Sequence, residues 1–183
     1  MRLITYTQGT DPRCGLALSD TVGLDLLAAD PTLPDTWHAL LSEMDRVRAL
    51  HDRYRDAAGA DAPVTAPLVR LADVQLLAPI LLPSKIIGVG LNYRDHAAEQ
   101  DRPLPELPML FGKAPGCLQT HDGPIALADD LTQVDAEAEL AVVIGRPARA
   151  VPADRAHEVI AGSTVFNDVT DRQAQRRDRQ LFR

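Results

Sequence analysis

Two glutamates separated by one residue, Glu137 and Glu139, are the first sign of chemistry in this chain. The β-branched, apolar run after them predicts a strand over residues 136–144. Because side chains on a strand alternate between its faces, both carboxylates point to the same side. Two like charges on one face repel each other and need a compensating partner. A divalent cation with oxygen ligands would supply it, and a water-facing edge strand is the alternative.

A second reactive pair, His96 and Glu99, lies in a segment that predicts a short helix over residues 91–100. Side chains three positions apart meet on one helical face. A carboxylate that orients an imidazole makes a general base near neutral pH. A surface ion pair with only a small effect on helix stability is the alternative.

Two further charged residues stand at the ends of predicted strands. Lys113 closes a strand that begins at Met109, where it would hold the carboxylate of a small anionic substrate; a solvated lysine is the alternative. Asp168 follows a strand predicted over residues 163–166 and is a third carboxylate candidate. For Asp168 the alternative is a helix N-cap.

The elements that must position these residues fall into two regions. Gly59 begins a linker rich in Ala, Asp and Pro. The sequence before this linker predicts strands and one helix, with Asp35 as the helix N-cap. A later helix is expected to end at Gly162 as a C-cap. The remaining predicted strands cover residues 2–7, 15–18, 22–26, 69–78 and 84–90. We therefore expect a small α+β N-terminal domain over residues 1–65 and a second domain over residues 66–183.

Composition excludes several classes of protein. The 183 residues are 45% hydrophobic and 25% charged, which is ordinary for a soluble globular protein. The net charge of -7 argues against a nucleic acid or an anionic membrane as the main partner. Cys14 and Cys117 form no CxxC motif, and no apolar run reaches the length of a membrane span. A cytoplasmic protein with free thiols is the expectation.

Four motifs in the second region occur in one order along the chain. They are G-V-G-L-N-Y-x-x-H-x-x-E, P-x-L-F-x-K, E-x-E-L-A-V-V-I-G and F-N-D-V-T-x-R. From about Ser84 to its end, the chain resembles the fumarylacetoacetate hydrolase family. The resemblance implies a mixed β-sandwich roll, so the fold class expected for the whole chain is α+β and mainly β. It also implies a homodimer.

The resemblance also implies the roles of the candidate residues. Mg²⁺ or Mn²⁺, with Ca²⁺ as an alternative, would be held by three carboxylates. These ligands match Glu137, Glu139 and Asp168. His96 and Glu99 match a general-base pair on a mobile lid, and Lys113 matches a lysine close to the substrate.

The implied reaction cleaves a carbon–carbon bond in a small 1,3-dioxo or 2-oxo acid, such as an acylpyruvate from aromatic compound catabolism. The cation would polarise the carbonyl group and stabilise the leaving enolate. His96 would take a proton from the attacking water, and Lys113 would neutralise negative charge on the substrate. Isomerisation and decarboxylation are the alternatives, because related members run them at the same kind of site.

The chain departs from the family pattern in three places. It stops at Arg183, before the position of a further active-site lysine, which indicates a fragment or a shortened member. Gln173 and Ser163 stand where many members have aspartate and tyrosine. An inactive homologue that associates through exposed strand edges is therefore a competing hypothesis. Nucleic-acid binding through the arginine-rich residues 172–183 is a third, which the acidity of the chain opposes.

Overall fold

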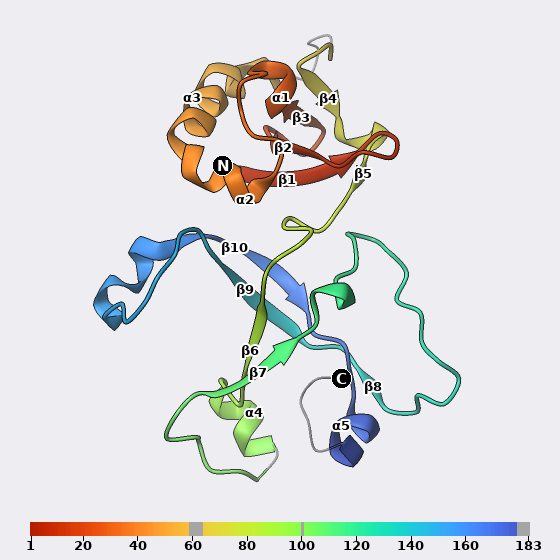
Figure 1. Cartoon of the computed structure of the whole chain (residues 1–183). Coiled ribbons are helices and arrows are strands. Elements are labelled where there is room, and N and C mark those ends of the chain that lie inside the picture. The colour runs from red at the N-terminus through yellow and green to blue at the C-terminus, as the bar shows by residue number, and fades with distance from the viewer. Residues whose placement is uncertain (59–63, 100, 179–183) are drawn as a thin grey trace. The chain divides into compact units, whose positions relative to one another are not determined.

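The computed structural model describes residues 1–58, 64–99 and 101–178, and Figure 1 labels its helices and strands. The chain divides into two compact units. The first unit contains Met1–Leu81, Gln119–Pro124 and Glu139–Phe166. The second contains Leu82–Leu118, Ile125–Ala138 and the described residues from Asn167 onward. The fold is α+β and mainly β, as predicted.

An antiparallel sheet of five strands, in the order β4-β3-β2-β1-β5, organises the first unit. Its strands are β1 (Arg2–Thr7), β2 (Arg13–Ala17), β3 (Val22–Asp25), β4 (Leu68–Arg70) and β5 (Gln75–Leu76). The strand predicted over residues 69–78 is instead two short strands, separated by the 3-10 turn Leu71–Asp73. A domain boundary at residues 65 and 66 stays a prediction, and the sheet itself continues past it to Leu76.

Short helices follow β3. They are α1 (Leu26–Ala29), α2 (Trp37–Leu40) and α3 (Met44–Tyr54), with 3-10 turns at Leu41–Glu43 and Arg55–Ala58. The predicted N-cap at Asp35 is wrong, because Thr36 holds that position and makes no capping side-chain hydrogen bond. Residues 59–63 of the predicted linker lie outside the described residues.

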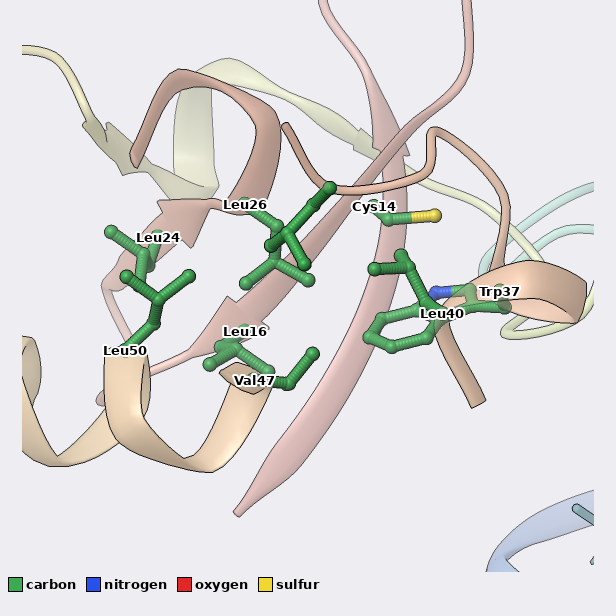
Figure 2. Close-up of a cluster of buried hydrophobic side chains, with 9 residues drawn as sticks. Cys14, Leu16, Leu24, Leu26, Trp37, Leu40, Val47 and Leu50 are labelled. Atoms are coloured by element: carbon green, nitrogen blue, oxygen red, sulfur yellow. The ribbon is translucent and has the colours of Figure 1, made fainter. Parts of the chain in front are cut away.

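The helices and the sheet share one hydrophobic core, shown in Figure 2. Its fully buried side chains include Leu16, Leu24, Leu26, Leu40 and Val47. Trp37 packs in the same core and donates its indole N–H to the carbonyl of Ile4 at 3.2 Å. The apolar side of the predicted helix therefore packs as its spacing indicated.

One buried carboxylate, Asp25, ties this sheet to α1. Tyr6 donates its hydroxyl to Asp25 at 2.6 Å, Arg13 forms an ion pair with it, and the N–H of Ala28 donates to it at 2.8 Å. Burial by itself raises the pKa of Asp25, but the hydrogen bonds from Arg13 and Tyr6 outweigh it and hold the pKa below its ordinary value. The folded chain therefore favours the ionised form of Asp25.

This shift predicts acid sensitivity. A carboxyl group whose pKa is lowered by folding stabilises the fold above its unfolded pKa, about 3.9, and that contribution disappears as the pH falls through the folded pKa. Asp25→Asn should cost about 1–3 kcal/mol at pH 7 and reduce the loss of stability between pH 7 and pH 3. Urea unfolding at both pH values measures this. Asp20→Asn, at an exposed ion pair with Arg2, is the control. An unchanged pH dependence in Asp25→Asn would contradict the prediction.

The rest of the chain forms three two-stranded sheets. Strands β6 (Ile86–Gly90) and β7 (Met109–Lys113) are antiparallel, as are β8 (Val134–Asp135) and β11 (Thr170–Asp171), while β9 (Ala138–Ile144) pairs with β10 (Ile160–Asn167). The helices are α4 (Arg94–Glu99) and α5 (Arg172–Asp178), and 3-10 turns cover Pro115–Cys117 and Ala153–Val159. Gln100, the last residue of the predicted helix, lies outside the described residues, as do residues 179–183 of the arginine-rich segment.

The strand predicted over residues 136–144 is observed as β9, which begins at Ala138, so Glu137 precedes the strand. One prediction in this part is wrong. The helix predicted to end at Gly162 is a 3-10 turn, and Gly162 lies inside β10. The N–H of Gly145 donates to the carbonyl of Val159 at 2.8 Å, so the chain is already paired across the hairpin where the helix was expected.

In residues 1–58, 64–99 and 101–178, every helix is too short or too polar to cross a bilayer.

Candidate active site

The three predicted carboxylates come together. Glu137, Glu139 and Asp168 each offer one oxygen, and these oxygens all lie within 4.8 Å of one another. Glu137 lies in the break between β8 and β9, Glu139 is the second residue of β9, and Asp168 directly follows β10. The backbone N–H of Asp168 donates to the carbonyl of Glu137 at 2.9 Å, which holds the two segments side by side.

Asp168 is buried, and Lys113 balances its charge. Its side chain is 3% exposed, that of Lys113 is 11% exposed, and the two form an ion pair. Asp168 is therefore not a helix N-cap, and Lys113 is not a solvated lysine, so both alternatives from the sequence are wrong. The cap of α5 is Asp171, which accepts hydrogen bonds from the N–H groups of Gln173 and Ala174 at 3.2 and 3.1 Å.

Arg172 contacts the site, although the sequence indicated no role for it there. Its guanidinium contacts Glu137 and also donates to Asp135 at 2.8 Å. The hydrogen bond from Arg172 is the main cause that lowers the pKa of Asp135, and the charge of His96 lowers that pKa least. Burial lowers the pKa of Arg172 itself, but Asp135 and Glu137 outweigh it and raise that pKa. The arginine of the F-N-D-V-T-x-R motif was the only sequence signal for this contact.

The predicted base pair lies on α4. The Nδ1 atom of His96 is 3.8 Å from an Oε atom of Glu99, which is beyond hydrogen-bond length. The side chains of His96 and Glu99 are 38% and 78% exposed. The helix brings the pair to one face as expected, and catalytic hydrogen bonds often shorten only when substrate binds.

The donor set fits a hard divalent cation, which prefers carboxylate oxygens. Lys113 pairs with Asp168, and Arg172 pairs with Glu137 and with Asp135, a fourth carboxylate outside the cluster. The arrangement can therefore hold a cation and leave coordination positions open for a small oxygen-rich ligand.

Residues 85–183 match the family model described as fumarylacetoacetate (FAA) hydrolase, C-terminal. The chain belongs to the fumarylacetoacetate hydrolase family. This match contains every residue of the candidate site, from His96 to Arg172. The predicted family and fold class are thereby confirmed.

Members of the family with similar sequences and structures catalyse different reactions. The oxaloacetate tautomerase YisK of Bacillus subtilis is 36% identical over 181 residues, which cover 92% of this chain and 60% of YisK. The solved 5-carboxymethyl-2-hydroxymuconate delta-isomerase of Mycobacterium smegmatis has a TM-score of 0.68 and 33% identity, and the match covers 100% of this chain and 60% of that one.

A third relative was solved with a metal. The maleylpyruvate hydrolase of Sphingobium sp. SYK-6, in complex with manganese(II) ion and pyruvate, has a TM-score of 0.71 and 26% identity, and the match covers 94% of this chain and 60% of that one. The chain thus spans about 60% of the length of all three relatives. They are a tautomerase, an isomerase and a hydrolase, so membership of the family does not select a reaction.

Proposed function

We propose that this chain carries the cation site of an enzyme that hydrolyses a carbon–carbon bond in small 1,3-dioxo or 2-oxo acids of the acylpyruvate type. The observation that carries the proposal is the cluster of Glu137, Glu139 and the buried Asp168. The proposed cation is Mg²⁺ or Mn²⁺, with Ca²⁺ as an alternative. The manganese and pyruvate bound by the maleylpyruvate hydrolase support both the metal and the substrate class.

Each residue has a proposed role. When bound, the cation would supply Lewis-acid stabilisation of negative charge on the substrate oxygen. His96 would accept a proton from water, and Glu99 would orient its imidazole and stabilise the protonated ring. Lys113 would fix the Asp168 carboxylate, a role that their ion pair supports more directly than the predicted contact with substrate.

Keto–enol tautomerisation is the second candidate. YisK is more similar in sequence, at 36% identity, than the maleylpyruvate hydrolase, at 26%. His96 would then move a proton to and from the carbon beside the carbonyl group, with no water consumed. Isomerisation of another oxo acid and decarboxylation would use the same groups, and they remain alternatives within the family.

Assembly and location belong to the same proposal. A homodimer is supported by exposed apolar side chains on paired strands, among them Ile87 and Leu110 on β6 and β7 and Val142 on β9. We propose a cytoplasmic protein without nucleic-acid or membrane partners, for which the net charge of -7 is the supporting observation. Solution mass by light scattering tests the dimer.

An assay with two substrates tests the function. With Mn²⁺ added, acetylpyruvate should lose its enol absorbance and release pyruvate, which a lactate dehydrogenase couple detects. A tautomerase would instead speed the change in enol absorbance of oxaloacetate without raising the rate of pyruvate release above the Mn²⁺ blank. Glu137→Gln and Glu139→Gln should each weaken Mn²⁺ binding at least about tenfold in calorimetry, because each removes a charged ligand.

Glu158→Gln is the matched control, since Glu158 is an exposed carboxylate paired with Arg155 on a 3-10 turn. It should bind Mn²⁺ like the unchanged chain. If the Glu137 and Glu139 variants also kept the original affinity, the assignment of the site would be wrong. Turnover that persists in excess EDTA would reject metal dependence.

A further inference from the structure

We propose that Arg172 is a positioning residue that keeps Asp135 out of the cation site and so decides which carboxylates serve as ligands. The inference rests on the proposed function, because it needs a cation at the carboxylate cluster. It concerns the selection of ligands, and neither the family match nor the spacing of the motifs contains that information.

Four carboxylates lie in the segments that form the proposed cation site, but only three of them cluster. Asp135, Glu137 and Glu139 are spaced by two residues, and Asp168 lies beside Glu137. All four have the oxygen chemistry that a hard cation prefers. Yet only Glu137, Glu139 and Asp168 form the cluster with oxygens within 4.8 Å of one another. Something must separate Asp135 from the other three.

Arg172 makes that separation. Its Nη2 and Nε atoms donate to the same oxygen of Asp135, at 2.8 and 3.1 Å, and Nη2 also contacts Glu137. The planar guanidinium is always charged and holds carboxylates in a fixed geometry. Arg172 is only 21% exposed, whereas Asp135 is 53% exposed, so the arginine draws this carboxylate into a paired position near the protein surface.

The backbone holds Arg172 in place independently of these ion pairs. Thr170 lies opposite Asp135 and Asp171 opposite Val134 in the β8–β11 ladder, and the N–H of Arg172 donates to the carbonyl of Gln133 at 2.9 Å. Arg172 is also the first residue of α5. The backbone of Arg172 is therefore held next to β8, the strand that ends at Asp135.

Two consequences follow for a bound cation. With Asp135 paired, three protein carboxylates remain, and a cation that takes six ligands keeps positions for water and for two substrate oxygens. The positive charge of Arg172 also weakens cation binding, while Asp135 offsets that effect. Removal of Arg172 would free Asp135 and add one unit of negative charge at the site.

Calorimetry and water proton relaxation with Mn²⁺ as the probe test this inference on the full chain. Arg172→Gln should bind Mn²⁺ about three- to tenfold more tightly and carry fewer coordinated waters, seen as a lower relaxation enhancement. The charge-matched double variant Arg172→Gln/Asp135→Asn should restore both values. Arg155→Gln, which removes an exposed arginine of the Glu158 pair, should behave like the unchanged chain.

Unchanged affinity and relaxation in Arg172→Gln, or a double variant that behaves like Arg172→Gln, would overturn the inference. If Arg172→Gln does not fold, Asp135→Asn decides: it should bind Mn²⁺ several-fold more weakly with the same number of waters, and unchanged affinity rejects the proposal. Failure of the proposed function looks different. In that case the unchanged chain binds no Mn²⁺, or Glu137→Gln leaves its affinity intact.

Discussion

Asp168→Asn is expected to abolish Mn²⁺ binding and to destabilise the unit that contains it. Asparagine keeps the shape of the side chain but removes its charge, so the cation loses a ligand. Lys113, which is 11% exposed, loses its counter-charge at the same time. Breaking a buried ion pair by removing one partner costs about 3–5 kcal/mol, because the other charge stays buried. Calorimetry should show at least about 100-fold weaker Mn²⁺ binding, and urea unfolding should show the loss of stability.

A second substitution separates these two effects. Lys113→Met combined with Asp168→Asn removes both buried charges, so it should recover much of the lost stability while Mn²⁺ binding stays absent. Asp130→Asn, which changes an exposed aspartate of the same unit, should alter neither property. Mn²⁺ affinity that survives in Asp168→Asn would remove this residue from the ligand set.

His96→Ala should have the second large effect, on turnover alone. A positioned general base contributes about 10²- to 10⁴-fold to rate, and the ring of His96 is not one of the clustered oxygen donors. Steady-state rates should therefore fall by that factor, while Mn²⁺ affinity should change by less than about twofold. Glu99→Gln should lower the rate less, because it removes only the carboxylate that orients the imidazole and stabilises its protonated form.

His121→Ala is the matched control, since His121 also pairs with a neighbouring acid, Asp122, at an exposed position. Its turnover should equal that of the unchanged chain. A parallel loss of rate and of Mn²⁺ affinity in His96→Ala would instead indicate that His96 supports the ligands or the fold.

Much of the site could be predicted because local patterns determine it. His96 and Glu99 stand three residues apart on a helix, so helical periodicity brings them to one face, and Glu137 and Glu139 are only two residues apart in the chain. The same reasoning placed β1 and β7 at their observed bounds, since alternating apolar residues favour strands. The assignment of Asp168 as the third ligand depended in addition on the order of the four family motifs.

The family, the fold class and the three clustered carboxylates could thus be predicted from the sequence. The way in which the charges of these carboxylates are balanced depends on contacts between distant segments of the fold. Lys113 and Asp168 are 55 residues apart, and Arg172 and Glu137 are 35 apart, so no local period predicts either contact. Glu137 lies between β8, which pairs with β11, and β9, which pairs with β10, and the sequence did not indicate this change of partner. Pairing between distant segments depends on the whole fold, and it gives Arg172 its position between Asp135 and Glu137.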